Sequence, residues 1–103
     1  MKAGYVYILA NKPHGTLYIG VTSNIEQRIW QHKLNVFEGF TQRYNVKMLV
    51  HLEVFSDIRD AIAREKALKF WKRAWKIRLI EENNPHWHDL AVPVCEGPCL
   101  VDH

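Results

Sequence analysis

Alternating apolar and polar residues predict two short strands near the start of the chain. Residues 4–10 (GYVYILA) and 16–21 (TLYIGV) are rich in β-branched and aromatic side chains, which favour strands. Between them stand Asn11, Pro13 and Gly15, three residues that favour turns. The pattern therefore predicts an antiparallel hairpin.

The register of this hairpin decides where its tyrosines lie. Alternation places Tyr5, Tyr7 and Leu9 on one face of the first strand, and Tyr18 and Gly20 on one face of the second. These faces coincide only if Tyr7 lies opposite Tyr18 or Gly20, because a slip of one residue reverses every side chain. Gly20 is then expected to leave open space beside the phenols. Two tyrosines packed on a core are also ordinary in a hairpin, so the pair alone does not define a site.

A helix is predicted over about residues 25–35, where apolar residues recur at helical spacing, with Ser23 or Asn24 as its cap. Arg28 and His32 are four residues apart and share one face of it, where both can reach the same phosphate. The guanidinium of Arg28 offers paired, permanently charged donors, and His32 can donate a hydrogen bond or move a proton near neutral pH. Such a pair is also common on an exposed helix face. The residues expected to face the core are Ile25, Ile29 and Leu34.

The next part of the chain predicts a third strand and a long helical region. A loop over 36–45 precedes an alternating apolar segment over 46–55, which predicts the strand. From Ser56 or Asp57 to about residue 82 the spacing is helical, over a length greater than that of an average helix. We therefore expect a break near 70–73 and two helices packed at an angle. Their expected core residues are Ala61, Ile62, Leu68, Phe70, Trp71, Ala74, Trp75, Leu79 and Ile80.

Charge is concentrated in this helical region. The chain of 103 residues has a formal net charge of +3, but residues 59–78 hold eight basic and two acidic side chains. A basic stripe interleaved with aromatic residues favours a polyanionic partner, because binding phosphates releases counterions. On charge alone, a solvated helix face fits equally well. The side chains expected to contact nucleic acid are Lys66, Lys69, Lys72, Arg73 and Lys76.

Glu65 is the only acidic residue between Asp60 and Glu81. A carboxylate among cations is often an ion-pair partner. It can also anchor one hydrated Mg²⁺, which commonly takes one or two protein carboxylates and fills its other positions with water and phosphate. The sequence leaves both roles open for Glu65.

The end of the chain predicts little chemistry. Pro85 is expected to end the helical region, and Trp87 to pack back against the body. The prolines and glycine beyond residue 91 predict an irregular tail, where Cys95 and Cys99 are too close together to staple the fold. Together with His86 and His88, these cysteines do not match the spacing of common zinc sites.

Composition excludes several classes of protein. With 48% hydrophobic residues, the chain can bury one modest core, which indicates a single domain. No apolar run approaches the ~20 residues needed to span a bilayer, and the start of the chain lacks the features of a signal peptide. A soluble cytoplasmic protein without a membrane partner is expected, and no protein partner is identifiable.

The ordered motifs resemble one known family. Over roughly residues 4–90, the chain resembles the small single-domain bacterial branch of the GIY-YIG endonuclease superfamily. The first motif departs from the name-giving sequence, since it has YVY in place of Gly-Ile-Tyr, although Tyr7 keeps the tyrosine position. The motifs that carry the resemblance are YVYIL, LYIGVT, NIEQRIWQH, GFTQRY, AIAREKALKFWKRAWKIRLIEE and NPHWHDL.

The resemblance implies an α+β domain over 1–90, a three-stranded antiparallel sheet flanked by helices, followed by the irregular tail over 91–103. It also implies hydrolysis of DNA phosphodiester bonds with one divalent ion, Mg²⁺ or Mn²⁺. A compact domain with its own basic helix is expected to recognise backbone shape, so cleavage should be structure-selective or weakly sequence-specific, as in DNA repair or recombination. The alternatives are a non-catalytic nucleic-acid-binding module and, less favoured, a protein-interaction domain with a vestigial site.

Individual roles follow from the same resemblance. Tyr7 and Tyr18 match the motif tyrosines. Arg28 matches the arginine that holds the scissile phosphate, and His32 matches a polar residue one helical turn further on. Glu65 falls at the position of the metal-binding glutamate. These five residues come from four predicted elements, so the fold must bring them together.

Two assignments stay open at this level. Asn84 falls where the family has an asparagine near the site, with Asn83 as the alternative. An unperturbed tyrosine has a pKa of about 10, so roughly 0.1% is phenolate at pH 7, and Arg28 and a metal are expected to lower that pKa. Tyr7 is expected to be the general base and Tyr18 to orient water or phosphate, although the two roles can be exchanged.

Overall fold

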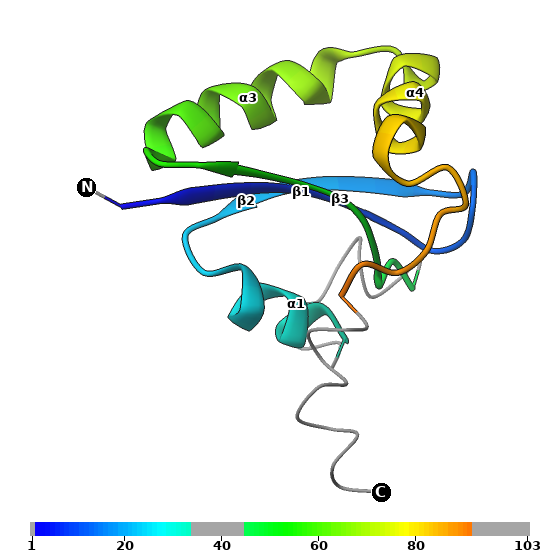
Figure 1. The fold of residues 1–103 in the computed structure, drawn as a ribbon, viewed down its shortest axis with the longest axis horizontal. Helices are drawn as coiled ribbons and strands as arrows, with labels where there is room; N and C mark the ends of the chain where they lie inside the picture. The colour runs from blue at the N-terminus through cyan, green and yellow to red at the C-terminus, as the bar shows by residue number, and fades with distance from the viewer. Residues whose placement is uncertain (1, 34–44, 92–103) are drawn as a thin grey trace, which may run out of the picture.

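The computed structural model describes residues 2–33 and 45–91. Leu34, the predicted loop up to residue 44 and the tail over 92–103, with Cys95 and Cys99, lie outside these ranges. The predicted α+β fold is confirmed, with a three-stranded antiparallel sheet that has helices on both faces (Figure 1). The elements in chain order are β1 (Gly4–Ala10), β2 (Leu17–Thr22), α1 (Ile25–Lys33), β3 (Met48–Phe55), α3 (Ile58–Phe70) and α4 (Arg73–Asn83).

The sheet has the strand order β2-β1-β3, so β1 lies in the centre and pairs antiparallel with both neighbours. In the hairpin, Tyr7 lies opposite Gly20 and Leu9 lies opposite Tyr18. This is one of the two registers that place both phenols on the same face, as predicted. The turn is closed by Asn11, whose side-chain oxygen accepts a hydrogen bond of 2.9 Å from the backbone N–H of Thr16.

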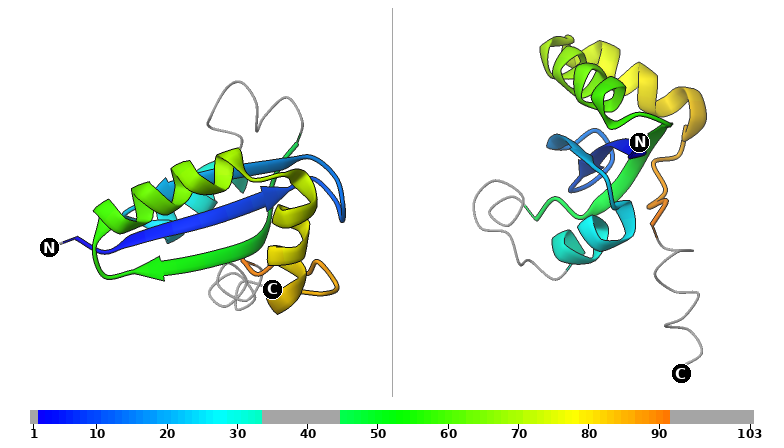
Figure 2. Two further views of the ribbon diagram at one scale, coloured as in Figure 1. Left: turned by 90° about the horizontal axis from the view of Figure 1, so that it is seen from above. Right: turned by 90° about the vertical axis from the view of Figure 1, so that its left-hand side faces the viewer.

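The two faces of β1 serve two separate cores. Val6 and Ile8 pack beneath α3 and α4, whereas Tyr7 and Leu9 pack on the side of α1. Figure 2 shows this arrangement from two sides, with α3 running above the strands and α1 below them. The alternation of a strand therefore places Tyr7 in the layer between the sheet and α1.

Side-chain caps fix where α1 and α3 begin. Asn24 accepts a hydrogen bond of 3.1 Å from the N–H of Gln27, and Asp57 accepts one of 2.9 Å from the N–H of Arg59. The sequence left two candidates for each cap, and the structure shows that Asn24 and Asp57 are the capping residues. The predicted break in the long helical region is also confirmed, since α3 ends at Phe70 and α4 begins at Arg73.

The core prediction for these two helices is partly wrong. Ala61, Leu68 and Ile80 are buried, and Trp71 and Leu79 are partly buried, as expected. Helices that cover one face of a sheet bury only the stripe that faces it, and their outward residues stay exposed. The residues wrongly assigned to the core are Ile62, Phe70, Ala74 and Trp75, of which Phe70 is 91% exposed.

None of the described helices has the length and apolar character needed to cross a membrane.

The turn of the hairpin is fastened to α4. Arg73 donates hydrogen bonds of 2.7 and 2.6 Å to the carbonyl oxygens of His14 and Gly15. Glu81 accepts one of 2.8 Å from the indole N–H of Trp87 and lies 3.1 Å from the His14 imidazole. Trp87 is buried, as predicted. These contacts hold the hairpin against α4.

Candidate active site

The ring of Tyr7 packs on Gly20. The ring of Tyr7 is fully buried and crosses the backbone of Gly20 on the neighbouring strand. A Cβ atom at Gly20 would lie 2.9 Å from Cε1 of the ring and closer still to Cζ and the hydroxyl oxygen. The open space expected beside the phenols is therefore filled by the Tyr7 ring, and only glycine allows that approach.

The second tyrosine and the arginine lie beside this ring. The centroids of the Tyr7 and Tyr18 rings are 6.4 Å apart, and Tyr18 remains partly exposed. Arg28, on α1, donates a hydrogen bond to the Tyr7 hydroxyl. Residue 32 lies on the same helix, but the side chain of His32 is outside the part of the chain that the structure describes. Three of the predicted site residues are thus brought together by β1, β2 and α1.

The fourth element of the site is α3, which supplies Glu65. This carboxylate is only 8% exposed and forms an ion pair with Lys69, one helical turn further on. Its charge also acts on the Tyr7 hydroxyl. Among the described residues, no group of three or more His, Cys, Asp or Glu side chains could hold a metal ion. A single buried carboxylate fits a largely hydrated Mg²⁺, and does not fit a metal that needs several protein ligands.

The environment of Tyr7 raises the pKa of its phenol to about 12. Burial is the main cause, because it disfavours the charged phenolate, and the nearby Tyr18 adds to it. Arg28 lowers the pKa of Tyr7, as predicted, whereas the negative charge of Glu65 raises it. The net pKa of Tyr7 is nevertheless raised, since burial outweighs the arginine.

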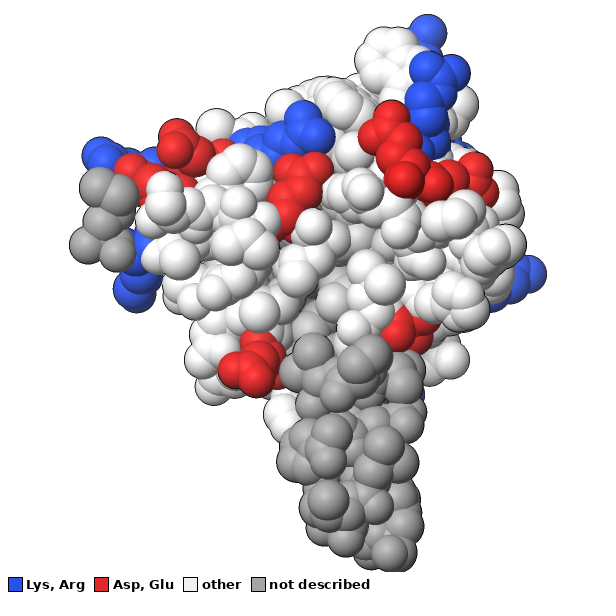
Figure 3. All heavy atoms as spheres, viewed as in Figure 1, with Lys and Arg blue, Asp and Glu red and all other residues white. Residues whose placement is uncertain are grey.

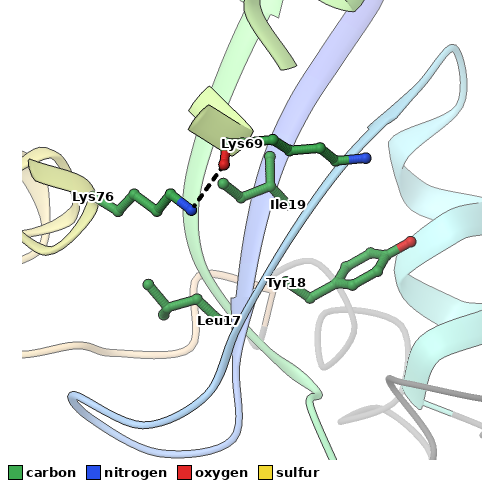
Figure 4. A pocket seen from close by; sticks show the side chains of 5 residues that line it. All are labelled: Leu17, Tyr18, Ile19, Lys69 and Lys76. Atoms are coloured by element: carbon green, nitrogen blue, oxygen red, sulfur yellow. Dashed lines mark hydrogen bonds between the residues drawn. The ribbon is translucent and has the colours of Figure 1, made fainter. Parts of the chain in front are cut away.

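A hollow of about 350 Å³ opens beside Tyr18, at the outer edge of β2. Figure 4 shows Lys69 reaching across it from the end of α3, Lys76 entering from α4, and the Tyr18 hydroxyl pointing toward α1. The Lys76 amine donates a hydrogen bond of 3.4 Å to the backbone oxygen of Lys69. The hollow is lined by Leu17, Tyr18, Ile19, Lys69 and Lys76. Two cations at an apolar edge suit a nucleotide, whose phosphate is charged and whose base has apolar faces.

Comparison with known proteins gives a match to one family model. The family model described as the GIY-YIG catalytic domain matches residues 3–78, a span that contains Tyr7, Tyr18, Arg28 and Glu65. The chain belongs to the GIY-YIG family. GIY-YIG domains are nucleases, so membership places the protein in a nuclease family with nucleic acid as substrate.

Several relatives share this GIY-YIG domain. A UPF0213 protein of Staphylococcus haemolyticus is 37% identical over 82 residues, which cover 80% of this chain and 99% of that protein. A UPF0213 protein of Syntrophus aciditrophicus is 37% identical over 84 residues, covering 81% and 95%. The solution NMR structure of a UPF0213 protein from Bacillus halodurans has a TM-score of 0.54 at 24% identity, covering 87% and 95%, and shows the same fold.

The basic residues of the GIY-YIG domain have different surroundings. Lys69 and Lys76 line the hollow, and Lys66 is exposed on α3. The Lys72 amine lies 5.5 Å from the centre of the Trp75 ring, and Arg73 holds the hairpin turn. Carboxylates offset part of the positive charge, and Figure 3 shows Lys and Arg beside Asp and Glu over α3 and α4. Contact of these five side chains with DNA stays a prediction. The described ion pairs of the region are Arg59–Asp57, Arg64–Glu53 and Lys69–Glu65.

Asn84 forms structural hydrogen bonds at the end of α4. Its amide nitrogen donates hydrogen bonds of 3.2 and 2.8 Å to the carbonyl oxygens of Val50 and His88, and its oxygen accepts one of 3.0 Å from the N–H of His88. These bonds tie the end of α4 to β3. Asn84 is buried, whereas Asn83 is exposed, and the family match ends before both. A catalytic role for Asn84 stays a prediction.

Sequence reasoning missed a second polar cluster in the GIY-YIG domain. The buried His51 lies 2.9 Å from Glu53, which also accepts hydrogen bonds of 2.9 and 3.1 Å from Arg64. Arg64 in turn lies 5.0 Å from the centre of the Trp71 ring. Partial burial opposes the charge on Glu53, but the hydrogen bonds from Arg64 and His51 outweigh it and lower the pKa of Glu53. They join α3 to β3, and no sequence spacing indicated them.

The raised pKa of Tyr7 predicts that the GIY-YIG domain loses stability at alkaline pH. An unfolded tyrosine titrates near ~10, whereas folded Tyr7 titrates at about 12, so the folded state holds this proton more tightly. The stabilisation is present below pH ~10 and is lost as the pH rises to about 12, at a cost of about 2–3 kcal/mol. Urea unfolding at pH 8, 10 and 11 should show a fall in unfolding free energy that is smaller in Tyr7→Phe. An equal fall in both proteins would show that Tyr7 is not its source.

Proposed function

We propose that the protein is a metal-dependent endonuclease that hydrolyses DNA phosphodiester bonds, with selection for DNA structure or weak sequence preference, in DNA repair or recombination. One observation carries the proposal. Among the described residues, the ring of Tyr7 lies 6.4 Å from that of Tyr18, and the side chains that shift the pKa of Tyr7 are Tyr18, Arg28 and Glu65, all predicted site residues. Strands β1 and β2 and helices α1 and α3 supply these four residues, which supports a site assembled around one hydroxyl.

Each residue has a role that its chemistry supports. The Arg28 guanidinium can hold the scissile phosphate and offset its charge. Tyr7 takes the proton of the attacking water, while Tyr18, at the edge of the hollow, orients the water or the phosphate. His32 lies one helical turn beyond Arg28 and assists at the same phosphate.

Glu65 is the residue that would hold the divalent ion, Mg²⁺ or Mn²⁺. Such an ion supplies a Lewis acid for the phosphate and charge compensation for the leaving oxygen. The negative charge of Glu65 raises the pKa of Tyr7, so offsetting that charge makes the Tyr7 phenol easier to ionise. This coupling supports Tyr7 as the base.

The hollow supports selection by shape. Lysine amines such as those of Lys69 and Lys76 contact phosphates, which position a strand without reading its bases. A strand that leaves the duplex at a flap or branch can enter the hollow more easily than one held in a regular helix. We therefore propose branched, flap or nicked DNA as the preferred substrate.

A non-catalytic nucleic-acid-binding module is the second candidate. It is favoured by two observations: Glu65 forms an ion pair with Lys69, and the pKa of Tyr7 is raised to about 12. Such a module would bind DNA in a salt-sensitive way and would not cut it.

A cleavage assay separates these two functions. End-labelled linear, nicked, flap and branched DNA are incubated with the protein in Mg²⁺, in Mn²⁺ and in a chelator. We expect cleavage only with a metal, faster on flap and branched DNA than on linear duplex, with Glu65→Gln as the inactive control. Salt-sensitive binding without cleavage of any substrate would support the module, and equal cutting by the wild type and Glu65→Gln would refute the assigned site.

A further inference from the structure

We propose that Lys69 is a tethered cation that exchanges between Glu65 and a DNA phosphate, so that DNA and the divalent ion bind cooperatively. The inference rests on the proposed function, in which Glu65 is the metal ligand. It adds a specific role for Lys69 and an expected order of events: DNA draws Lys69 away, and Glu65 becomes available to the metal.

The unequal burial of the two partners is the first step. The side chain of Glu65 is 10% exposed, whereas that of Lys69 is 55% exposed. A carboxylate largely removed from water requires a compensating charge, and Lys69 supplies it in this structure. Lys69 sits on a flexible stem and remains in contact with water, so its amine can move away when another cation compensates the Glu65 carboxylate. Glu65 is held in place between α3 and the sheet.

Competition for the carboxylate is the second step. The Lys69 amine contacts Oε2 of Glu65, one of the two oxygens available to a metal. Two cations that share one small carboxylate repel each other, and the repulsion grows where water is largely excluded. A divalent ion on Glu65 therefore requires Lys69 to move.

The hollow beside Tyr18 provides a destination. Lys69 lines it together with Lys76, and Figure 4 shows the Lys69 side chain extending along the edge of β2 on the side to which the Tyr18 hydroxyl points. A phosphate in the hollow would attract both amines. The same lysine that blocks Glu65 without DNA is thus suited to bind DNA once a strand arrives.

Thermodynamic linkage gives the measurable consequence. If DNA removes the competitor of the metal, DNA raises the affinity for the metal, and the metal must raise the affinity for DNA by the same factor. Couplings of this kind typically amount to about 5- to 150-fold. A protein without Lys69 should lose the coupling, because its Glu65 is accessible from the start.

The test measures Mn²⁺ affinity from the electron paramagnetic resonance signal of the free ion, with and without a short flap DNA. The Tyr7→Phe background retains Glu65 and Lys69 and keeps the DNA intact. We expect DNA to raise Mn²⁺ affinity by about 5- to 150-fold when Lys69 is present. Lys69→Met should raise the DNA-free affinity by a similar factor and remove most of the coupling. Lys12→Met, which removes the same charge from an exposed position in the hairpin turn, should behave like its parent.

A second variant keeps the inference testable if Lys69→Met does not fold. Lys69→Arg keeps the charge and can hold a carboxylate through two donors, so it should lower DNA-free Mn²⁺ affinity below that of the parent. Unchanged DNA-free affinity in both variants, or independent binding of DNA and Mn²⁺ by the parent, would overturn the inference. Metal-dependent cleavage by the wild type would leave the proposed function standing in that case. Absence of Mn²⁺ binding with and without DNA would overturn the inference and the metal role of Glu65 together.

Discussion

Replacement of Tyr7 by Phe is expected to slow DNA cleavage by about 10²- to 10⁴-fold, the range typical of a lost general base. The substitution removes one oxygen and keeps the ring that rests on Gly20, so the fold should persist. Arg28 loses a hydrogen-bond acceptor but can still bind phosphate. Single-turnover cleavage of a flap substrate in Mg²⁺ measures the effect on the chemical step.

The pH dependence of the rate identifies the base. Because the pKa of Tyr7 is about 12, little of it is phenolate at neutral pH. The wild-type rate should therefore rise by about tenfold per pH unit over the neutral range and level off only as the pH approaches the pKa of the site with metal bound. Tyr7→Phe should lose this slope, whereas Tyr18→Phe should retain it with a smaller loss of rate. A flat profile in Tyr18→Phe and a steep one in Tyr7→Phe would exchange the two roles.

The hairpin could be predicted because its information is local. Alternation assigns Tyr7 and Tyr18 to faces, and turn residues limit the register to a few choices. The caps at Asn24 and Asp57 are equally local, since each side chain bonds the N–H of a residue two or three positions away. Local rules of this kind carry over directly from sequence to structure.

The helices over the sheet were harder to predict. Phe70 and Trp75 are apolar at helical spacing, but whether such residues are buried depends on which side of α3 and α4 faces the sheet. The net rise in the pKa of Tyr7 was missed for a related reason, because the burial of its ring depends on α1 covering it. Spacing could have indicated the pair of Glu65 and Lys69, since oppositely charged residues four apart on a helix commonly meet.

Gly20→Ala is expected to impair both stability and catalysis. The added Cβ would overlap the Tyr7 ring, and insertion of a methyl group into a packed layer typically costs about 1–3 kcal/mol. The ring must then shift away from β2, and a displacement of about 1 Å in a reacting group can slow catalysis by about 10²-fold. Urea unfolding measures the first effect, and cleavage by the folded protein measures the second.

Gly4→Ala is the matched control for this prediction. It adds the same methyl group to β1, where the new Cβ would lie 2.7 Å from Cβ of Ala61 and 2.8 Å from Cα of Ile58, on α3. Gly4→Ala should therefore lower stability while the folded protein cuts at nearly the wild-type rate. If both variants lose stability and only Gly20→Ala loses cleavage rate, then catalysis depends on the position of the Tyr7 ring. Equal rates in the two variants would show that the ring can move without consequence.

A double-mutant cycle then isolates the contact itself. Tyr7→Val removes the ring that the Gly20 methyl group would meet, so the stability cost of Gly20→Ala should largely disappear in that background. Activity should stay low in the double variant, because the space is restored but the phenol is absent. A full stability cost in the Tyr7→Val background would mean that Gly20 matters for the strand and not for the ring. Glycine at this position would then be required for the sheet alone, and its place in the motif would have no catalytic reason.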